Sequence, residues 1–187
     1  ETDRQLMQII MRSKVRLENF VRDFLMLARP LPAARQLIDV AEVAAEVMDN
    51  IRMSSDWKEG LSLTNNIQEG IQVWANREQI VQIIFNLLAN ALQAVSGGGN
   101  IHLEIRPGEA ENNKNYIMIK VSDDGCGIEE KDMNNILEPF YTNKEKGTGL
   151  GLAIVSRIVD GYGGRLKIES LVGQGTQATV WIPSGQI

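Results

Sequence analysis

The sequence predicts an α+β protein, a two-layer α/β sandwich in which several helices cover one face of a mixed, mostly antiparallel sheet. Short segments with alternating apolar and polar residues are interleaved with longer segments whose apolar residues recur every three or four positions. Three pairs of strand-like segments are joined by polar or glycine-containing stretches, which favours antiparallel pairing. A long helix is predicted to precede this sandwich.

Residues 3–28 are predicted to form that long helix. Its seam positions alternate steps of four and three, and six of the seven are apolar: Leu6, Ile10, Ser13, Leu17, Phe20, Phe24 and Leu27. This spacing is typical of a helix in a coiled coil or bundle, and an amphipathic helix folded onto its own domain is the alternative. The prolines of "ARPLP" end the helix, because proline lacks a backbone N–H. We therefore divide the chain into residues 1–30 and a globular domain at residues 31–187.

The globular domain is predicted to contain seven strands and four helices. The strands are expected at residues 35–40, 61–67, 71–75, 101–107, 116–123, 165–171 and 177–183, and the helices at residues 40–53, 76–95, 129–137 and 151–162. Asp39 is expected to cap the first of these helices, and "SGGG" ends the second. The stretch "QEG" is expected to form the turn between the second and third strands, and "VGQG" joins the last two.

Composition excludes several classes of protein. The chain of 187 residues has a net charge of −5, which argues against a nucleic-acid partner bound through a basic surface. Cys126 is the only cysteine, so no intrachain disulfide is possible, and a reducing, cytoplasmic setting fits. No apolar run approaches the roughly 20 residues that span a bilayer, and the sequence does not predict a signal peptide within these residues. Because the chain begins at Glu1, we expect a fragment of a longer protein, whose membrane anchoring the sequence leaves open.

A glycine-rich stretch, "GTGLGL" at residues 147–152, precedes the last predicted helix. Such clusters often bind phosphate, because glycine lets backbone N–H groups approach an anion at a helix N-terminus. The string does not fit the P-loop pattern, and Leu152 stands where a dinucleotide fingerprint needs its third glycine. The preceding residues are polar and do not predict a strand. Both common phosphate-binding motifs are therefore disfavoured.

Three further stretches place polar side chains where chemistry could use them. Asn86 and Asn90 lie four residues apart on one face of an otherwise apolar helix, which is costly unless both amides meet polar partners. Asp123 ends a predicted strand before a glycine-containing turn, where a carboxylate can accept a hydrogen bond from an amine on a flat ring. Thr176 adds a small hydroxyl near the start of the last strand.

Taken in chain order, these stretches resemble the ATP-binding domain of sensor histidine kinases. The motifs are "NLLANALQA" at 86–94, "SDDGCGI" at 122–128, "EPFYT" at 138–142, "GTGLGL" at 147–152 and "GQGT" at 173–176. That family belongs to the wider group that includes gyrase, Hsp90 and MutL. The resemblance covers about residues 33–183 and implies a Bergerat-type ATP-binding fold. The "FYTNK" form and the short run that follows it look most like the nitrogen-regulation type.

This resemblance implies ATP and Mg²⁺ as cofactors. Asp123 should accept a hydrogen bond from the adenine amino group, with Thr176 supporting it through ordered water, and should reject guanine, whose carbonyl oxygen would face it. Asn90 should ligate Mg²⁺ through its side-chain oxygen, with Asn86 assisting one turn earlier, because Mg²⁺ prefers oxygen ligands. The alternatives are a turn-capping role for Asp123 and, for the two asparagines, a helix-capping or core hydrogen-bonding role.

The resemblance also implies a phosphate-binding loop. The loop residues expected to bind the cofactor are Gly147, Thr148, Gly149, Leu150, Gly151 and Leu152, and Gly125 and Gly127 should let the backbone approach its flat ring. Gly147, Gly149 and Gly151 should let backbone amides reach the triphosphate and should act as hinges for a lid between Pro139 and Lys146. Lys144 is expected to contact the terminal phosphate, with a solvated lysine as the alternative. Gln93 and Asp124 depart from the common Lys or Arg and Asn, which puts one phosphate contact in doubt and adds a charge beside Asp123.

Catalysis is assigned by the resemblance to Asn86, Asn90 and Lys144. Relatives that hydrolyse ATP carry a glutamate base where Asn86 stands, so the asparagine favours phosphoryl transfer over hydrolysis. Family members phosphorylate a histidine on the first helix of a dimerisation bundle, for relay to an aspartate of a response regulator. The single histidine, His102, lies in a predicted strand without that motif. We therefore expect an ATP-dependent protein-histidine kinase fragment whose acceptor helix lies outside this chain.

Residues 1–30 resemble the second helix of that bundle. The expected partners are an acceptor helix of the same or a partner protomer and a response-regulator receiver domain, with a homodimer in the full-length protein. Neither nucleic acid nor membrane contact is expected for this fragment, and its expected location is cytoplasmic. Two alternatives remain: a serine kinase of the anti-sigma type, and a catalytically inactive ATP-binding scaffold.

Overall fold

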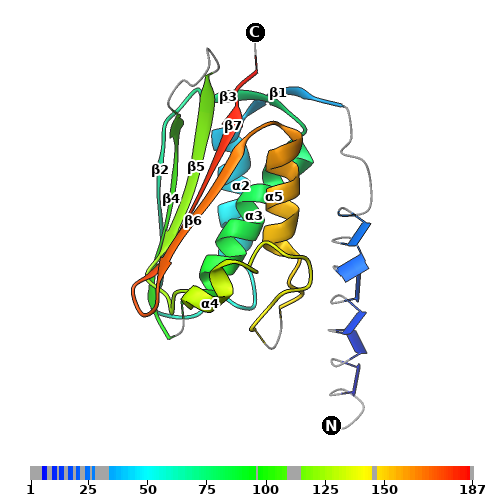
Figure 1. Ribbon diagram of the computed structural model, residues 1–187, viewed down its shortest axis with the longest axis vertical. Helices are drawn as coiled ribbons and strands as arrows, with labels where there is room; N and C mark the ends of the chain where they lie inside the picture. The colour runs from blue at the N-terminus through cyan, green and yellow to red at the C-terminus, as the bar shows by residue number, and fades with distance from the viewer. Residues whose placement is uncertain are drawn as a thin grey trace.

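The computed structural model describes residues 34–95, 97–108, 115–144 and 147–185, together with a subset of positions between 6 and 27. The elements of the globular domain are β1 (Gln36–Asp39), α2 (Val40–Arg52), β2 (Leu61–Ile67), β3 (Gln72–Ala75), α3 (Arg77–Ala94), β4 (Gly99–Pro107), β5 (Tyr116–Asp123), α4 (Glu130–Met133), α5 (Gly151–Gly161), β6 (Arg165–Leu171) and β7 (Gly175–Pro183). Figure 1 shows α2, α3 and α5 on one side of a sheet, so the predicted two-layer arrangement is confirmed.

The larger sheet has five strands in the order β2-β4-β5-β7-β6. Only the β2–β4 pair is parallel, and the other three pairs are antiparallel. The predicted mixed, mostly antiparallel sheet is therefore correct. In the β5–β7 pair Asp123, at the end of β5, lies directly opposite Thr176, near the start of β7. The register therefore brings two predicted site residues together where these two strands meet the adjoining loops.

A second, two-stranded sheet pairs β1 with β3 in antiparallel register. The stretch "QEG" does form a turn, with Gly70 at a φ of 74°. The strands on either side of this turn nevertheless belong to different sheets, because β2 pairs with β4 and β3 with β1. Sequence alternation predicted both strands but could not predict their partners, since pairing depends on contacts distant in the chain.

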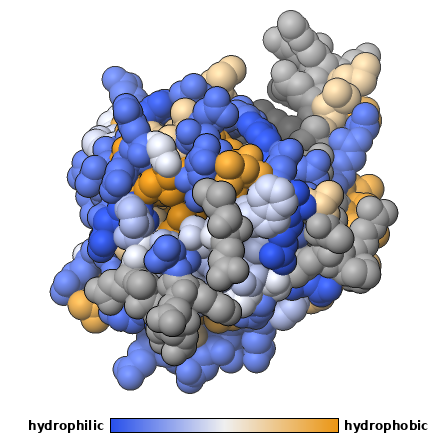
Figure 2. Space-filling model, turned by 90° about the horizontal axis from the view of Figure 1, so that it is seen from above, coloured by the Kyte–Doolittle hydropathy of each residue, from blue (hydrophilic) through white to orange (hydrophobic). Residues whose placement is uncertain are grey.

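The core lies between the helices and the inner face of the five-stranded sheet. Alternate residues of β4, namely Ile101, Leu103 and Ile105, are fully buried, and they face fully buried residues of α3 such as Ile83 and Leu87. Seen from above in Figure 2, apolar side chains gather near the middle of the face and hydrophilic ones surround them. The burial of these β4 and α3 side chains fixes α3 against the sheet, because a close-packed interior tolerates little shift.

His102 lies on the opposite side of β4 from those core residues, as strand alternation requires. Its Nδ1 is 2.9 Å from the Oγ1 of Thr64 on the neighbouring strand β2. The prediction of a sheet histidine is therefore confirmed.

The N-terminal segment is helical at every described position between 6 and 27. Its seam side chains Leu6, Ile10, Leu17 and Phe24 are all about half exposed or more. Described contacts between the segment and the globular domain include the Phe20 and Phe140 rings, whose centroids are 6.4 Å apart, the Arg157 side chain, which donates to the Leu27 carbonyl, and the Leu27 side chain, which packs against the core. The predicted boundary between the helix and the domain lies outside the described residues.

Helix α4 is shorter than the helix predicted at residues 129–137. It ends at Met133, and the N–H groups of Asn135 and Ile136 both donate to the carbonyl of Asp132. Tandem asparagines explain the early end, because short polar side chains favour turns over helix interiors. The segment that follows thus runs back toward α3 in place of continuing as a helix.

Asp39 caps α2 as predicted, since its Oδ1 accepts from the Ala41 N–H at 2.8 Å and the Glu42 N–H at 3.4 Å. We expect Asp39→Ala to lower the free energy of unfolding by about 1 kcal/mol, the usual contribution of an N-cap. Chemical denaturation of the two proteins measures this difference. Asp39→Asn is the matched control and should retain most of the stability, and an equal loss in both variants would contradict the capping role.

Candidate functional site

A cavity of about 720 Å³ lies between α3, α4, the start of α5 and the adjoining ends of β5 and β7. Most of the predicted site residues line it: Asn86, Asn90, Asp123, Gly127, Lys144, Gly147, Thr148, Gly149, Gly151, Leu152 and Thr176. Gly125 and Leu150 do not, and Leu150 is fully buried in the core. The volume suits a ligand of cofactor size. The structure thus gathers into one site residues that are up to 90 positions apart in the chain.

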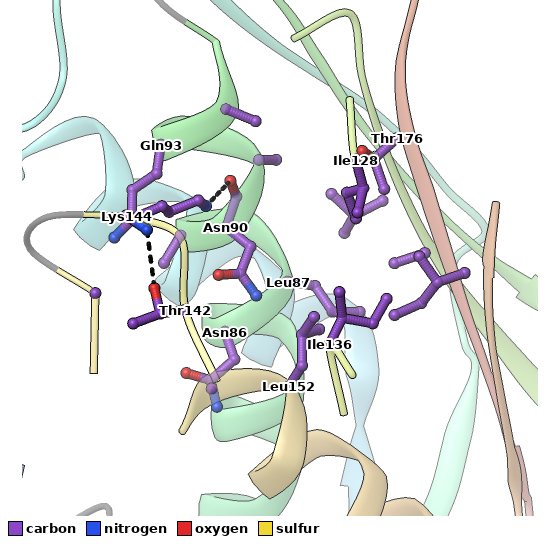
Figure 3. Close-up of a pocket in the computed structure, with 18 of the residues that line it drawn as sticks. Asn86, Leu87, Asn90, Gln93, Ile128, Ile136, Thr142, Lys144, Leu152 and Thr176 are labelled. Carbon is purple, nitrogen blue, oxygen red and sulfur yellow. Dashed lines mark hydrogen bonds between the residues drawn. The ribbon is translucent and has the colours of Figure 1, made fainter. Parts of the chain in front are cut away.

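Asn86 and Asn90 lie one turn apart on the face of α3 that borders the cavity (Figure 3). Their Nδ2 atoms are buried and have no hydrogen-bond partner among the described residues. A third buried amide on the same helix, Gln79, instead accepts a hydrogen bond from the Tyr162 hydroxyl. Unpaired buried polar groups are costly, so the contrast indicates that Asn86 and Asn90 are kept for a polar ligand.

Asp123 holds its carboxylate at the end of β5, where Oδ1 accepts from the Gly125 N–H at 3.0 Å. Burial raises the pKa of the Asp123 carboxyl above its ordinary value, while hydrogen bonds from the backbones of Gly125 and Thr176 oppose the shift. The Thr176 Oγ1 is 2.9 Å from the Ser170 Oγ, which fixes its hydroxyl beside the carboxylate. The carboxylate therefore remains a strong acceptor facing the cavity.

The carboxylate of Asp124, the residue after Asp123, makes hydrogen bonds away from the Asp123 carboxylate. Its two carboxylate oxygens accept from the backbone N–H and the side-chain amide of Asn100, each at 2.8 Å. These hydrogen bonds lower the pKa of the Asp124 carboxyl. Its charge is the smallest of the causes that raise or lower the pKa of Asp123, so burial is the main reason for that shift. The hydrogen bonds of the Asp124 carboxylate thus join the turn after β5 to the start of β4.

Two glycines allow the close approaches that shape the cavity. A Cβ on Gly125 would lie 2.6 Å from the carbonyl of Ala94, so only glycine lets this turn pack against the end of α3. Gly149 has a φ of 69°, and a Cβ there would lie 2.5 Å from the backbone of Phe140. The carbonyl of Gly149 accepts from the Phe140 N–H at 2.9 Å, which ties the two ends of the lid together.

Lys144 reaches α3 from the lid segment, residues 139–146, of which 139–144 are described. Its Nζ donates to the Asn90 carbonyl at 3.4 Å, and its backbone N–H donates to the Thr142 Oγ1 at 3.1 Å (Figure 3). Burial lowers the pKa of the Lys144 ammonium, and the Cys126 and Asp123 side chains oppose this. Lys144 is therefore partly buried in this structure, and its contact with phosphate stays a prediction.

Several lining residues were not identified from the sequence. Ile128 and Ile136 form an apolar wall, and Cys126 and Asp132 add polar groups. The apolar residues carry no signal that separates them from core residues. Tyr141 belongs to the "EPFYT" motif, which could have indicated it, whereas Asp132 could have been found only by knowing that its helix ends beside the cavity.

Comparison with known proteins gives the family. A family model described as the histidine kinase-, DNA gyrase B-, and HSP90-like ATPase matches residues 75–186. The chain belongs to this family. Its globular part is the catalytic ATP-binding domain found in sensor histidine kinases.

Curated relatives in this family are longer than the chain. The sensor histidine kinase ZraS of Salmonella typhimurium (strain LT2) is 28% identical over 179 residues, which are 96% of this chain and 38% of ZraS. Sporulation kinase D of Bacillus subtilis (strain 168) is 32% identical over 184 residues, which are 98% of this chain and 35% of that kinase. The chain therefore spans little more than a third of the length of these relatives.

Solved structures of the family share the fold. The nucleotide-free catalytic domain of the histidine kinase ThkA matches with a TM-score of 0.67 and 27% identity, over 81% of this chain and 96% of that chain. Full-length ShkA in complex with AMPPNP matches with a TM-score of 0.82 and 23% identity, over all of this chain and 40% of ShkA. The predicted family and α+β fold class are thus confirmed.

The raised pKa of Asp123 makes a prediction about stability without nucleotide. A carboxyl with a raised folded-state pKa favours folding below its ordinary pKa, and this contribution is lost as the pH rises through the folded-state value. Asp123→Asn should therefore gain stability relative to the parent chain as the pH rises from about 4, near the ordinary pKa of an aspartate, to about 7. Urea unfolding at both pH values measures the gain. Asp124→Asn is the control and should show no such gain, and an Asp123→Asn difference independent of pH would contradict the prediction.

Proposed function

We propose that this chain binds Mg·ATP in the cavity and serves as the catalytic part of a sensor histidine kinase, transferring the γ-phosphoryl group to a histidine on a separate helix. One observation carries the proposal. The cavity gathers an adenine-type acceptor at Asp123, two unpaired amides at Asn86 and Asn90, the cation Lys144 and a glycine loop at the start of α5. Each of these groups matches a different part of a nucleoside triphosphate.

The base end of the nucleotide belongs at Asp123. Its carboxylate is an acceptor without a proton to donate near neutral pH, so it pairs with the exocyclic amine of adenine and repels the carbonyl oxygen of guanine. Ile128 and Ile136 supply apolar surface on the cavity wall for a flat ring. This combination supports selection of ATP over GTP.

The phosphate end belongs between α3 and α5. Helix α5 begins at Gly151, and its N-cap Leu150 makes no side-chain capping bond, so its first-turn N–H groups are open to an anion. The amides of Asn86 and Asn90 fit a magnesium phosphate, because each offers an oxygen to the cation and an N–H to a phosphate oxygen. When bound, Mg²⁺ would neutralise charge on the phosphates. Asn90 is the proposed ligand and Asn86 its assistant.

Transfer to another group is favoured over hydrolysis. Asn86 occupies the position from which a base would activate water, and an amide cannot take a proton at neutral pH. The carboxylate of Asp132 also lies in the cavity, but its Oδ1 accepts a hydrogen bond from the Tyr141 hydroxyl at 2.7 Å, so we do not assign it the role of a base that activates water. Positioning by α3 and charge neutralisation by Lys144 would then provide the catalysis.

The acceptor is proposed to lie outside this chain. His102, the single histidine, is on the outer side of the sheet and does not line the cavity. We propose that residues 1–30 form the second helix of a dimerisation bundle, whose first helix carries the acceptor. The half-exposed apolar seam of the described positions 6–27 supports this, because such a seam requires a partner helix.

The parent protein is proposed to act as a homodimer that passes its phosphoryl group to the receiver domain of a response regulator, at the cytoplasmic side. The relatives named above are described as a sensor histidine kinase and a sporulation kinase, which supports a kinase function for the parent protein. Within the described part of the chain, none of the helices is long and apolar enough to cross a membrane.

A calorimetric titration with ATP tests the nucleotide site. We expect the unsubstituted chain to bind ATP only when Mg²⁺ is present, and Asp123→Asn to lose this binding. In Asn90→Ala, Mg²⁺ should no longer strengthen the binding of ATP. GTP should bind at least about tenfold more weakly, since a donor–acceptor mismatch leaves a buried group unpaired. Absence of ATP binding by the unsubstituted chain would contradict the proposal. If ATP binds, addition of an acceptor helix should yield acid-labile phosphohistidine, whereas acid-stable phosphoserine would favour the serine-kinase alternative.

Hydrolysis provides a separate prediction. The unsubstituted chain should release phosphate from ATP very slowly, and Asn86→Glu should raise the rate by about tenfold or more, because it introduces a general base. A continuous phosphate-release assay measures both rates. Asn86→Gln is the matched control, with the same side-chain length and no base, and rapid release by the unsubstituted chain would exclude the transfer mechanism.

A further inference from the structure

Asp132 is a buried carboxylate on α4 that the proposed chemistry does not use. It is 8% exposed and lines the cavity. Its Oδ1 accepts from the Tyr141 hydroxyl at 2.7 Å, and its Oδ2 accepts from the Asn143 side-chain amide at 3.4 Å. A buried carboxylate requires such partners, and here both come from the lid segment. The hydrogen bond to Asp132 also raises the pKa of the Tyr141 hydroxyl, so this hydroxyl remains a donor.

The two partners of Asp132 occupy alternate positions in the chain, which fixes the orientation of the segment between them. Thr142, the residue in between, accepts from the backbone N–H of Lys144 at 3.1 Å. On the other side Thr142 packs against Gly147, where a Cβ would lie 2.5 Å from its Oγ1. The lid is therefore held from α4 on one side and from the glycine loop on the other.

This arrangement determines where Lys144 lies. The Lys144 side chain crosses the cavity to α3 and donates to the Asn90 carbonyl at 3.4 Å (Figure 3). Among the described residues that line the cavity it is the cation, beside the two carboxylates of Asp123 and Asp132. A long, flexible lysine loses much side-chain entropy when it is fixed, so a rigid backbone beneath it matters for contact with phosphate.

We propose that Asp132 and Tyr141 are a positioning pair that holds the lid so that Lys144 meets the terminal phosphate of ATP. This inference rests on the proposed function, since it assigns Lys144 to that phosphate. Asp132 touches neither nucleotide nor acceptor in this role and acts through the lid. A purely structural role would affect all nucleotides alike, whereas the positioning role is specific for a nucleotide with a third phosphate.

The test compares ATP and ADP binding by calorimetry in Tyr141→Phe, which removes one hydroxyl and keeps the ring. We expect ATP affinity to fall by about tenfold or more, since tenfold lies at the lower end of the effect of losing a hydrogen bond to a charged group. ADP affinity should stay within about twofold, because the missing contact concerns only the terminal phosphate. Tyr116→Phe, at the start of β5 and outside the cavity lining, is the matched control and should change neither value.

A double-mutant cycle shows whether Tyr141 acts through Lys144. In a Lys144→Ala background the Tyr141→Phe change should cause no further loss of ATP affinity. An equal loss of ATP and ADP affinity, or full additivity in the cycle, would overturn the inference. ATP binding that is unaffected by Tyr141→Phe would also overturn it and leave the proposed function standing. Failure of the unsubstituted chain to bind ATP would overturn both.

Discussion

The structure depends on one constraint, which is that α3 must be apolar enough to anchor the sheet and polar enough to bind a ligand. Its buried residues Ile83, Leu87 and Leu88 pack into the core. One turn apart, it also buries the Nδ2 atoms of Asn86 and Asn90, which have no hydrogen-bond partner in the described part of the chain. Such amides destabilise the free protein. The remaining elements, from the end of β5 to the lid, are arranged so that a ligand can satisfy them.

Close backbone contacts bring those elements to α3. The turn after β5 packs on the end of α3 through Gly125, and Asp124 fastens the same turn to Asn100 at the start of β4. The lid returns to the glycine loop through the pair Phe140 and Gly149, and Phe140 has a φ of 70° that costs energy in a residue with a side chain. These contacts thus hold the turn after β5 and the lid in the positions that form the binding site.

Local sequence signals predicted most of the elements, and the failures have a common cause. Alternation and capping located β5, β6, α3 and the N-cap Asp39, because each depends on neighbouring residues. The separate sheets of β2 and β3, the short α4 and the lining role of Ile128 all depend on contacts distant in the chain. Motif order grouped most of the site residues without such knowledge, whereas Asp132 has no motif and is explained only by its place beside Tyr141.

The charge balance of the cavity explains why so many neutral groups are needed. The charged residues among its described lining are Asp123, Asp132 and Lys144, so the lining does not favour an anion by net charge. Gln93 also lines it and adds a neutral amide. A triphosphate in such a site must be held by backbone N–H groups, amides and a bound cation. Lys144 lies in a partly buried site, where electrostatic interactions are stronger than in water, so its single charge can contribute strongly to phosphate binding. The position of Lys144, which we propose is set by Asp132 through the lid, then determines how much of that contribution is realised.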